Sequence, residues 1–242
     1  MRDALREVGR VVIVAPETEQ SAASHALSLH RPLRLREVED DIFAVDGTPA
    51  DCVYVALYAQ GRAVPRVPDL VVSGLNHGLN LGQDVFYSGT VAAAREGALR
   101  RIPALAASAH VDADFVAAAD ACALIGRRLL EARPVLPNTT ERLIDSQIDE
   151  ARFVLLNVNF PPSWKGQFEA TRLGTRVYDE LVDFRRDPRG REYFWIGGPG
   201  VRHNENPGSD TDAYDRGMAS ITSLVLDLTD TSDAELVARL IR

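Results

Sequence analysis

One segment near the middle of the chain concentrates residue types that bind anions. Residues 73–90 read SGLNHGLNLGQDVFYSGT, with four glycines, two asparagines and a final Ser-Gly-Thr that opens a predicted helix. Glycine lets the backbone approach a ligand closely, and hydroxyls beside the free N–H groups of a helix start favour phosphate. The lysine of a P-loop is absent. Ser88, Gly89 and Thr90 are therefore candidate phosphate-binding residues, and a surface loop in which Ser88 or Thr90 only caps the helix is an equal alternative.

Oxygen ligands for a hard cation occur in the same segment and in the loop at residues 16–25. The Asn76 side-chain oxygen could coordinate a divalent cation, although asparagine in a glycine-rich loop more often occupies a left-handed turn. Ser21 or Ser24 could meet a metal or a phosphate, and a solvated loop is the commoner reading of that stretch. The histidines form no HxH or HxxxH pair, which argues against a histidine metal site. A Gly-x-Ser-x-Gly elbow is also absent, so an α/β-hydrolase triad has no support.

Short apolar runs alternate with helix-like segments along the first 160 residues. This alternation predicts an α/β fold with a Rossmann-like, doubly wound, mostly parallel sheet. Ligands of such sheets bind beyond the carboxyl ends of the strands, where both polar loops are expected. The predicted strands are 11–15, 33–38, 42–45, 70–72, 103–107 and 153–158. The predicted helices are 2–8, 49–60, 90–100 and 113–132, and the second begins with a capping box at Thr48 and Asp51.

The pattern changes after about residue 160. A Pro-Pro pair at 161–162 and a charged stretch at 183–191 interrupt β-like segments at 168–173 and 192–196, and a strand is predicted near 219–226. A capping box that starts at Ser232 predicts a final helix. We therefore predict an α/β catalytic core at 1–160 and, at 161–242, a β-rich extension with a C-terminal helix that serves oligomerisation.

Composition limits the class of function. The net charge is −8, so the chain as a whole does not attract nucleic acid backbones. The two cysteines, Cys52 and Cys122, read as small buried hydrophobic residues rather than a disulfide framework. No apolar run reaches the roughly 20 residues that span a bilayer, and no signal peptide is visible. We expect a cytoplasmic protein with no nucleic acid and no membrane partner.

The beginning of the chain suggests that an element is missing. Residues 2–8 look like the last turns of an amphipathic helix, with Gly9 as its stop. They lead into the continuous apolar run 11–15, which is typical of a strand buried in a parallel sheet. We expect an earlier strand to precede this helix.

Several motifs, in this order along the chain, resemble the survival protein SurE family. They are residues 15–16 with Ser21, then 47–53, 72–82, 87–97, 156–159, 211–213 and 217–222. The resemblance covers nearly the whole chain. It implies metal-dependent hydrolysis of nucleoside 5′- and 3′-monophosphates, with possible action on short polyphosphates. It also implies a C-terminal extension that forms homodimers or homotetramers.

The resemblance also implies a set of site residues. The family's divalent cation, Mg²⁺ or Mn²⁺, is held by two adjacent aspartates, a serine and an asparagine. Ser21 and Asn76 match the serine and the asparagine, as metal-binding and catalytic residues. Ser88, Gly89 and Thr90 match the phosphate-contacting segment, and Asn80 lies nearby in the same loop.

The sequence departs from the family at its start, where a strand ending in Asn-Asp-Asp-Gly is expected. Asp40-Asp41 lies in a hairpin-like turn and does not replace that segment. A start codon placed too late is the favoured explanation, ahead of a truncation or a natural short form. Without the aspartates this chain is expected to be nearly inactive. A catalytically inactive phosphate- or nucleotide-binding oligomer is the second hypothesis, and a sugar-nucleotide-binding transferase domain is a weaker third.

Overall fold

The central layer of the protein is a five-stranded sheet with the strand order β4-β5-β6-β12-β7. The computed structural model describes residues 1–132, 154–178, 182–196, 201–230, 232 and 238–241. The strands are β4 (Val71–His77), β5 (Ala104–Ala109), β6 (Leu155–Phe160), β7 (Phe168–Thr171) and β12 (Ala219–Leu224). The strands β4, β5 and β6 run parallel, β12 is antiparallel to β6, and β7 is parallel to β12. The predicted α/β class is confirmed.

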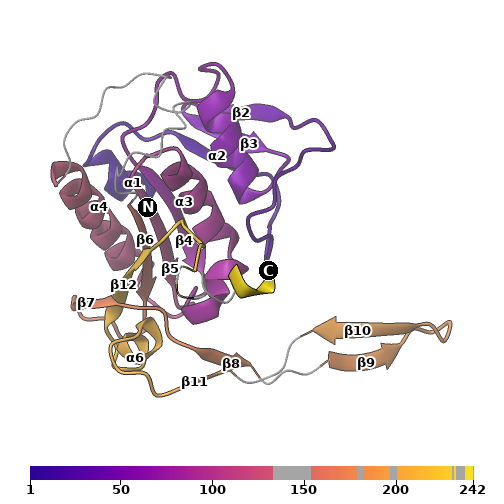
Figure 1. Cartoon of the computed structure of the whole chain (residues 1–242). Helices are drawn as coiled ribbons and strands as arrows, with labels where there is room; N and C mark the ends of the chain where they lie inside the picture. Colours follow the sequence, from indigo (N-terminus) through magenta and orange to yellow (C-terminus); the bar gives the residue numbers. More distant parts are fainter. Residues whose placement is uncertain (133–153, 179–181, 197–200, 231, 233–237, 242) are drawn as a thin grey trace.

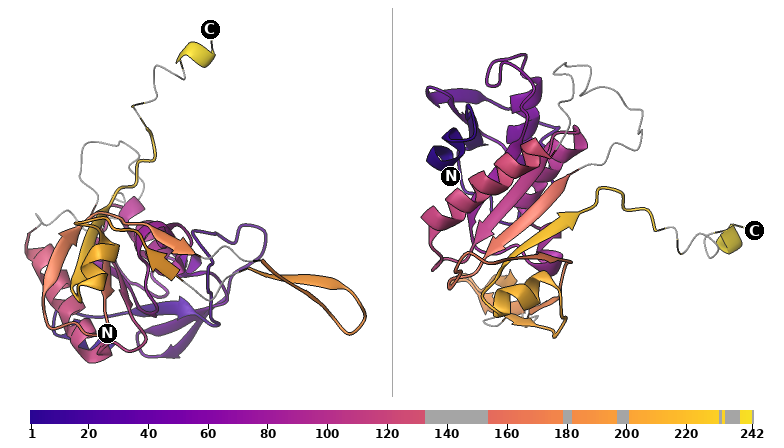
Figure 2. Two further views of the ribbon diagram at one scale, coloured as in Figure 1. Left: turned by 90° about the horizontal axis from the view of Figure 1, so that it is seen from below. Right: turned by 90° about the vertical axis from the view of Figure 1, so that its left-hand side faces the viewer.

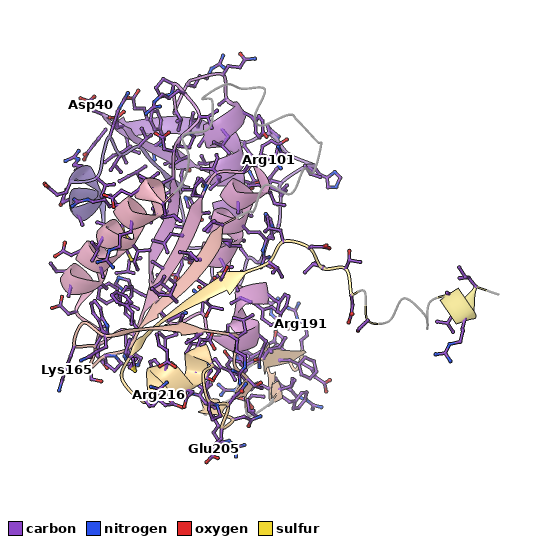
Figure 3. The ribbon with its side chains drawn as sticks, turned by 60° about the vertical axis from the view of Figure 1, so that its left-hand side comes forward. Asp40, Arg101, Lys165, Arg191, Glu205 and Arg216 are labelled. Carbon is purple, nitrogen blue, oxygen red and sulfur yellow. The ribbon has the colours of Figure 1, made fainter. Side chains whose placement is uncertain are left out.

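A smaller sheet is formed by β1 (Ile13–Pro16), β3 (Ile42–Val45) and β2 (Leu35–Glu39), in that order. The strands β1 and β3 are parallel, whereas β2 and β3 form an antiparallel hairpin. Asp40 and Asp41 occupy the hairpin turn as predicted, and Asp41 takes a positive φ of 61°. Asp40 lies at one end of the body, and Arg216 and Glu205 lie at the other (Figure 3).

Helices cover both faces of the central sheet (Figure 1). The helices α3 (Gly89–Leu99) and α2 (Pro49–Tyr58) pack together on one side, and α4 (Phe115–Glu131) with α1 (Arg2–Arg6) lies on the other. Alternate residues of β5 face the two layers, because Leu105 and Ala107 join the cluster with α4 whereas Ala104 and Ala106 join the cluster with α3. This period of two is the pattern of a strand buried on both faces.

Among the described residues, none of the helices has the length and apolar character needed to cross a membrane. Cys52 and Cys122 are both free and buried, as predicted. Burial raises the pKa of each thiol to about 12. Such thiols are inert packing groups at neutral pH.

Strand β4 is longer than the sequence predicted. The expected strand ended at Val72, but the observed strand continues to His77 and takes in Asn76. Asn76 and His77 pair with Ser108 and Ala109 of β5 after a register shift that follows Ser73. These long-range backbone pairings satisfy groups that a loop would leave to solvent, so the prediction of a loop was wrong for residues 73–77.

The C-terminal part contributes both to the central sheet and to an extension. The strands β7 and β12 complete the sheet, and α6 (Asp210–Asp215) packs beside them. Strand β8 (Arg176–Tyr178) pairs with β11 (Val201–His203), and β9 (Val182–Arg186) pairs with β10 (Glu192–Ile196). The β9–β10 hairpin projects away from the body (Figure 1), as do residues 225–230 after β12 (Figure 2).

The β-like segments at 168–173, 192–196 and 219–226 are confirmed as β7, β10 and β12. The three-residue strands β8 and β11 and the charged strand β9 were not predicted. The capping box predicted at Ser232 falls largely on residues outside the described part of the chain. The boundary at residue 160 stays a prediction.

Candidate phosphate-binding site

The N-terminus of α3 carries the candidate phosphate-binding turn. Ser88 is the N-cap, and its Oγ accepts a hydrogen bond from the Val91 N–H at 3.1 Å. Within the described residues, no acceptor is hydrogen-bonded to the N–H groups of Gly89 or Thr90. Ser88 is 8% exposed, Gly89 is buried and Thr90 is half-buried. The turn therefore combines a hydroxyl cap with two free N–H donors at the positive end of an eleven-residue helix.

The loop at residues 17–25 is held against this turn. The Ser24 N–H donates to the Tyr87 carbonyl at 3.0 Å, and the Ser24 hydroxyl donates to the Phe86 carbonyl at 2.7 Å. A methyl group at Gly89 would lie 2.9 Å from Pro49 Cγ and 3.6 Å from the Gln20 carbonyl oxygen. Gly89 is thus required by a close approach of three segments. These contacts place the exposed Ser21 in a loop beside the turn.

Asn80 lies in a buried network of side-chain amides. Its N–H donates to Asn159 Oδ1 at 2.8 Å, and its carbonyl accepts from Asn159 Nδ2 at 3.1 Å and from Asn157 Nδ2 at 2.8 Å. Its own Nδ2 donates to Ser108 Oγ at 2.6 Å. Asn80 is 7% exposed. The network fixes the backbone of the segment that leads to Ser88, and phosphate contact by Asn80 stays a prediction.

Asn76 and Ser21 are the predicted cation ligands. The Asn76 Nδ2 donates to the Gly78 carbonyl at 2.8 Å, which leaves its Oδ1 as an acceptor. The described part of the chain contains no group of three or more His, Cys, Asp or Glu side chains that could hold a metal ion. Two neutral oxygens do not by themselves fit Mg²⁺ or Mn²⁺, which take about six oxygen ligands and favour carboxylates. Among the described residues Ser21 and Asn76 share no hydrogen bond, and their shared role stays a prediction.

A buried charge cluster lies on α3, on the turn's own helix. The Glu96 carboxylate is 2% exposed, and it meets His25 Nε2 at 2.9 Å and Arg100 Nη2 at 2.8 Å. The Arg100 guanidinium also lies over the Tyr54 and Tyr58 rings, 5.7 and 5.6 Å from their centroids. His25 therefore ties the loop at 17–25 to α3. The i, i+4 spacing of Glu96 and Arg100 is the one sequence signal that indicates part of this cluster.

Known proteins share this architecture and these motifs. A family model described as survival protein SurE matches residues 1–180. The chain belongs to the SurE family. It is 55% identical over 228 residues to a protein of Sorangium cellulosum (strain So ce56) named 5′-nucleotidase SurE, with 94% of this chain and 84% of that protein covered.

Further relatives extend the comparison. A 5′-nucleotidase SurE of Myxococcus xanthus (strain DK1622) is 46% identical over 233 residues, which cover 94% of this chain and 82% of that protein. The crystal structure of the SurE protein from Aquifex aeolicus superposes with a TM-score of 0.78 at 34% identity, and the match covers 100% of this chain and 92% of that one. The resemblance to the SurE family is confirmed.

Proposed function

We propose that the protein is a 5′-nucleotidase that binds the phosphoryl group of a nucleoside 5′-monophosphate at the Ser88–Thr90 turn. The free N–H groups of Gly89 and Thr90 at the start of α3 are the observation that carries this proposal. Helix N-termini of this kind bind phosphate through backbone N–H groups and the helix dipole. The SurE relatives named 5′-nucleotidase support the same activity.

Each residue of the turn has a role that its chemistry allows. The Gly89 and Thr90 N–H groups and the Thr90 hydroxyl donate to phosphoryl oxygens, and they stabilise the negative charge that develops there in the transition state. The Ser88 Oγ already accepts from Val91 N–H, but a hydroxyl has one donor and two acceptor positions. Its O–H is therefore available to donate to the same phosphoryl group.

We further propose that hydrolysis requires a divalent cation, Mg²⁺ or Mn²⁺, with Ser21 and Asn76 as two of its ligands. When bound, such a cation would polarise a phosphoryl oxygen and lower the pKa of a water molecule, and it would need further oxygen ligands beside Ser21 and Asn76. Support comes from the free Oδ1 of Asn76 and from the position of the Ser21 loop beside the turn. The site's donors address the phosphoryl group, so 3′-monophosphates and short polyphosphates are proposed as further substrates. The cytoplasm remains the proposed compartment.

We also propose that the protein is a homodimer or homotetramer that uses the β9–β10 hairpin. The hairpin projects from the body (Figure 1), and Phe184, Phe194, Trp195 and Ile196 are 48, 59, 62 and 92% exposed. A cluster of exposed apolar side chains of this kind marks an interaction surface. We propose that a second copy of this chain covers these side chains, because the hairpin projects from its own body and leaves them exposed.

A second candidate function is nucleotide binding without hydrolysis, by a homo-oligomer. The donor set favours it, because Asn76 and Ser21 are neutral and hold a hard cation weakly without carboxylates. The two candidates differ in turnover, not in phosphate affinity.

The experiment measures orthophosphate release from 5′-AMP, 3′-AMP and tripolyphosphate, with Mg²⁺, with Mn²⁺ and with EDTA. The nucleotidase proposal expects release that EDTA abolishes and that Thr90→Val reduces. Thr229→Val, in an exposed segment after β12, is the matched control and should leave the rate unchanged. If 5′-AMP binds but no orthophosphate appears under any condition, the binding function replaces the enzyme. Equal rates for both variants would refute the role of the Thr90 hydroxyl.

A further inference from the structure

The short helix that leads into the phosphate-binding turn is held by residues about 90 to 130 positions away in the chain. This 3₁₀ helix, η1 (Gly82–Phe86), is separated from Gly89 by two residues. Hydrogen bonds hold η1 to β8 and to the start of α6, both in the C-terminal part. No residue in that part belongs to the phosphate-binding turn itself.

Asp84 links the two regions through its backbone and its side chain. Its carbonyl oxygen accepts from the Tyr87 N–H and from the Ser88 N–H, each at 3.0 Å. Its carboxylate accepts from the Tyr178 hydroxyl at 2.6 Å and forms an ion pair with Arg176. One residue therefore connects the N-cap of α3 to strand β8.

The Asp84–Arg176 pair is enclosed. The side chains of Asp84 and Arg176 are only 13 and 15% exposed, so solvent screens their attraction far less than that of a surface pair. Burial, followed by the hydrogen bond to Asp84, raises the pKa of Tyr178 to about 12. The phenol therefore remains a hydrogen-bond donor to Asp84 throughout the neutral pH range. Removal of Arg176 would leave the Asp84 carboxyl group partly buried, with the Tyr178 hydroxyl as its hydrogen-bond partner.

A second set of contacts fixes the start of η1. The Gly82 N–H donates to Asp210 Oδ2 at 2.9 Å, and the Gly174 N–H donates to Asp210 Oδ1 at 2.7 Å. Gln83 exchanges two hydrogen bonds with the backbone of Arg176, whose N–H donates to Gln83 Oε1 at 3.0 Å. The first three residues of η1 are therefore all bound to the C-terminal part of the chain. The helix has little freedom to shift unless β8 shifts with it.

We propose that Arg176 and Asp84 are positioning residues for the phosphate-binding turn. The ion pair with Arg176 holds Asp84 in position, and the Asp84 carbonyl holds the Ser88 N–H through a hydrogen bond. The Gly89 and Thr90 N–H donors follow Ser88 directly, so their positions depend on the same contacts. Neither side chain has to touch the phosphate for this. The inference rests on the proposed function of the turn, and it assigns part of that function to the C-terminal extension.

The test is orthophosphate affinity, measured by calorimetry on the whole chain, together with kcat and KM for 5′-AMP. Arg176→Ala should weaken orthophosphate binding about tenfold, because a misplacement of about 1 Å can cost up to about a hundredfold. Arg176→Lys, which keeps the charge, should recover part of the loss. Tyr178→Phe removes one hydrogen bond from Asp84 and should weaken binding about threefold.

Arg10→Ala is the matched control, because Arg10 forms a bidentate pair with Asp41, at 2.6 and 3.2 Å, on the small sheet. It should leave orthophosphate affinity unchanged. A role in stability alone predicts a lower melting temperature for Arg176→Ala with affinity within twofold of the wild type, and that result overturns the proposal. If Arg176→Ala does not fold, unchanged affinity in Arg176→Lys and Tyr178→Phe overturns it equally.

The positioning role and the nucleotidase activity are refuted by different results. If the wild type hydrolyses 5′-AMP and the variants bind orthophosphate with unchanged affinity, only the positioning role is refuted. If the wild type binds orthophosphate but does not hydrolyse 5′-AMP, the nucleotidase activity is refuted, and the variants still test the positioning role. If the wild type does not bind orthophosphate, both are refuted, because the turn then has no ligand.

Discussion

The substitution Ser88→Ala separates the two roles that the structure gives to one hydroxyl group. It removes the Oγ that accepts from Val91 N–H at 3.1 Å. Loss of an N-cap hydroxyl costs about 1–2 kcal/mol, and the high value is expected here because Ser88 is only 8% exposed and water replaces the bond poorly. For a chain of this length each kcal/mol lowers the melting temperature by about 2–4 °C, so the expected shift is about 4–8 °C.

The same substitution should reduce orthophosphate release from 5′-AMP far more than stability explains. Removal of one preorganised donor to a developing charge typically costs about a hundredfold or more in kcat. Ser88→Thr keeps both a capping oxygen and an O–H donor, and it should retain most of the stability.

Asp114→Ala is the matched control for the capping role. Asp114 caps α4, and its Oδ1 accepts from the Val116 and Ala117 N–H groups at 3.0 Å each. It should lower the melting temperature by a similar amount and leave turnover unchanged. If Ser88→Ala is destabilised as expected but hydrolyses 5′-AMP at the wild-type rate, the hydroxyl only caps the helix and the reasoning is refuted.

Three further predictions concern stability and assembly. Gly174→Ala should lower the free energy of unfolding by about 1–3 kcal/mol, because the added methyl would lie 2.1 Å from Thr211 Oγ1. Gly9→Ala is the control and should melt like the wild type, because a methyl group there has nothing within 4 Å. Equal melting temperatures for the two variants would contradict this prediction. For Asp51, burial raises the pKa, but the Ser28 and Thr48 N–H donors outweigh it and the net pKa lies below 3.8. A lowered carboxyl pKa stabilises the fold above pH 3.8 and loses that effect as the pH falls through the lowered value. In urea, Asp51→Asn should thus cost about 1–3 kcal/mol at neutral pH and less below the lowered pKa, and a constant difference would exclude the charge as its source. Trp195→Glu on the hairpin should lower the mass measured by light scattering to that of a monomer. Val116→Glu on the exposed face of α4 is the control and should leave the mass unchanged. An unchanged mass for both variants would show that the hairpin is not part of the interface.

Local rules predicted the parts of this fold that depend on neighbours in sequence. The Thr48–Asp51 capping box forms as predicted, with both reciprocal hydrogen bonds. Ser88 caps α3 for the same reason. The apolar runs became strands because alternate residues, such as Leu105 and Ala106, meet different helices.

Contacts between distant residues set what the sequence did not predict. The extension of β4 through Asn76 depends on pairing with Ser108, 32 residues away, and on the close approach of Gly74 to the Ala107 carbonyl. The strand order, with β12 between β6 and β7, joins segments more than 45 residues apart. No propensity of Asp84 or Arg176 alone indicates their ion pair, because only the fold brings them together.

The most direct test of the account is a crystal structure of the protein grown with 5′-AMP. If the turn binds the phosphoryl group, its oxygens lie within about 3 Å of the Gly89 and Thr90 nitrogens, at hydrogen-bonding distance. A nucleotide whose phosphoryl group lies elsewhere, with these two N–H groups bonded to water, would contradict it.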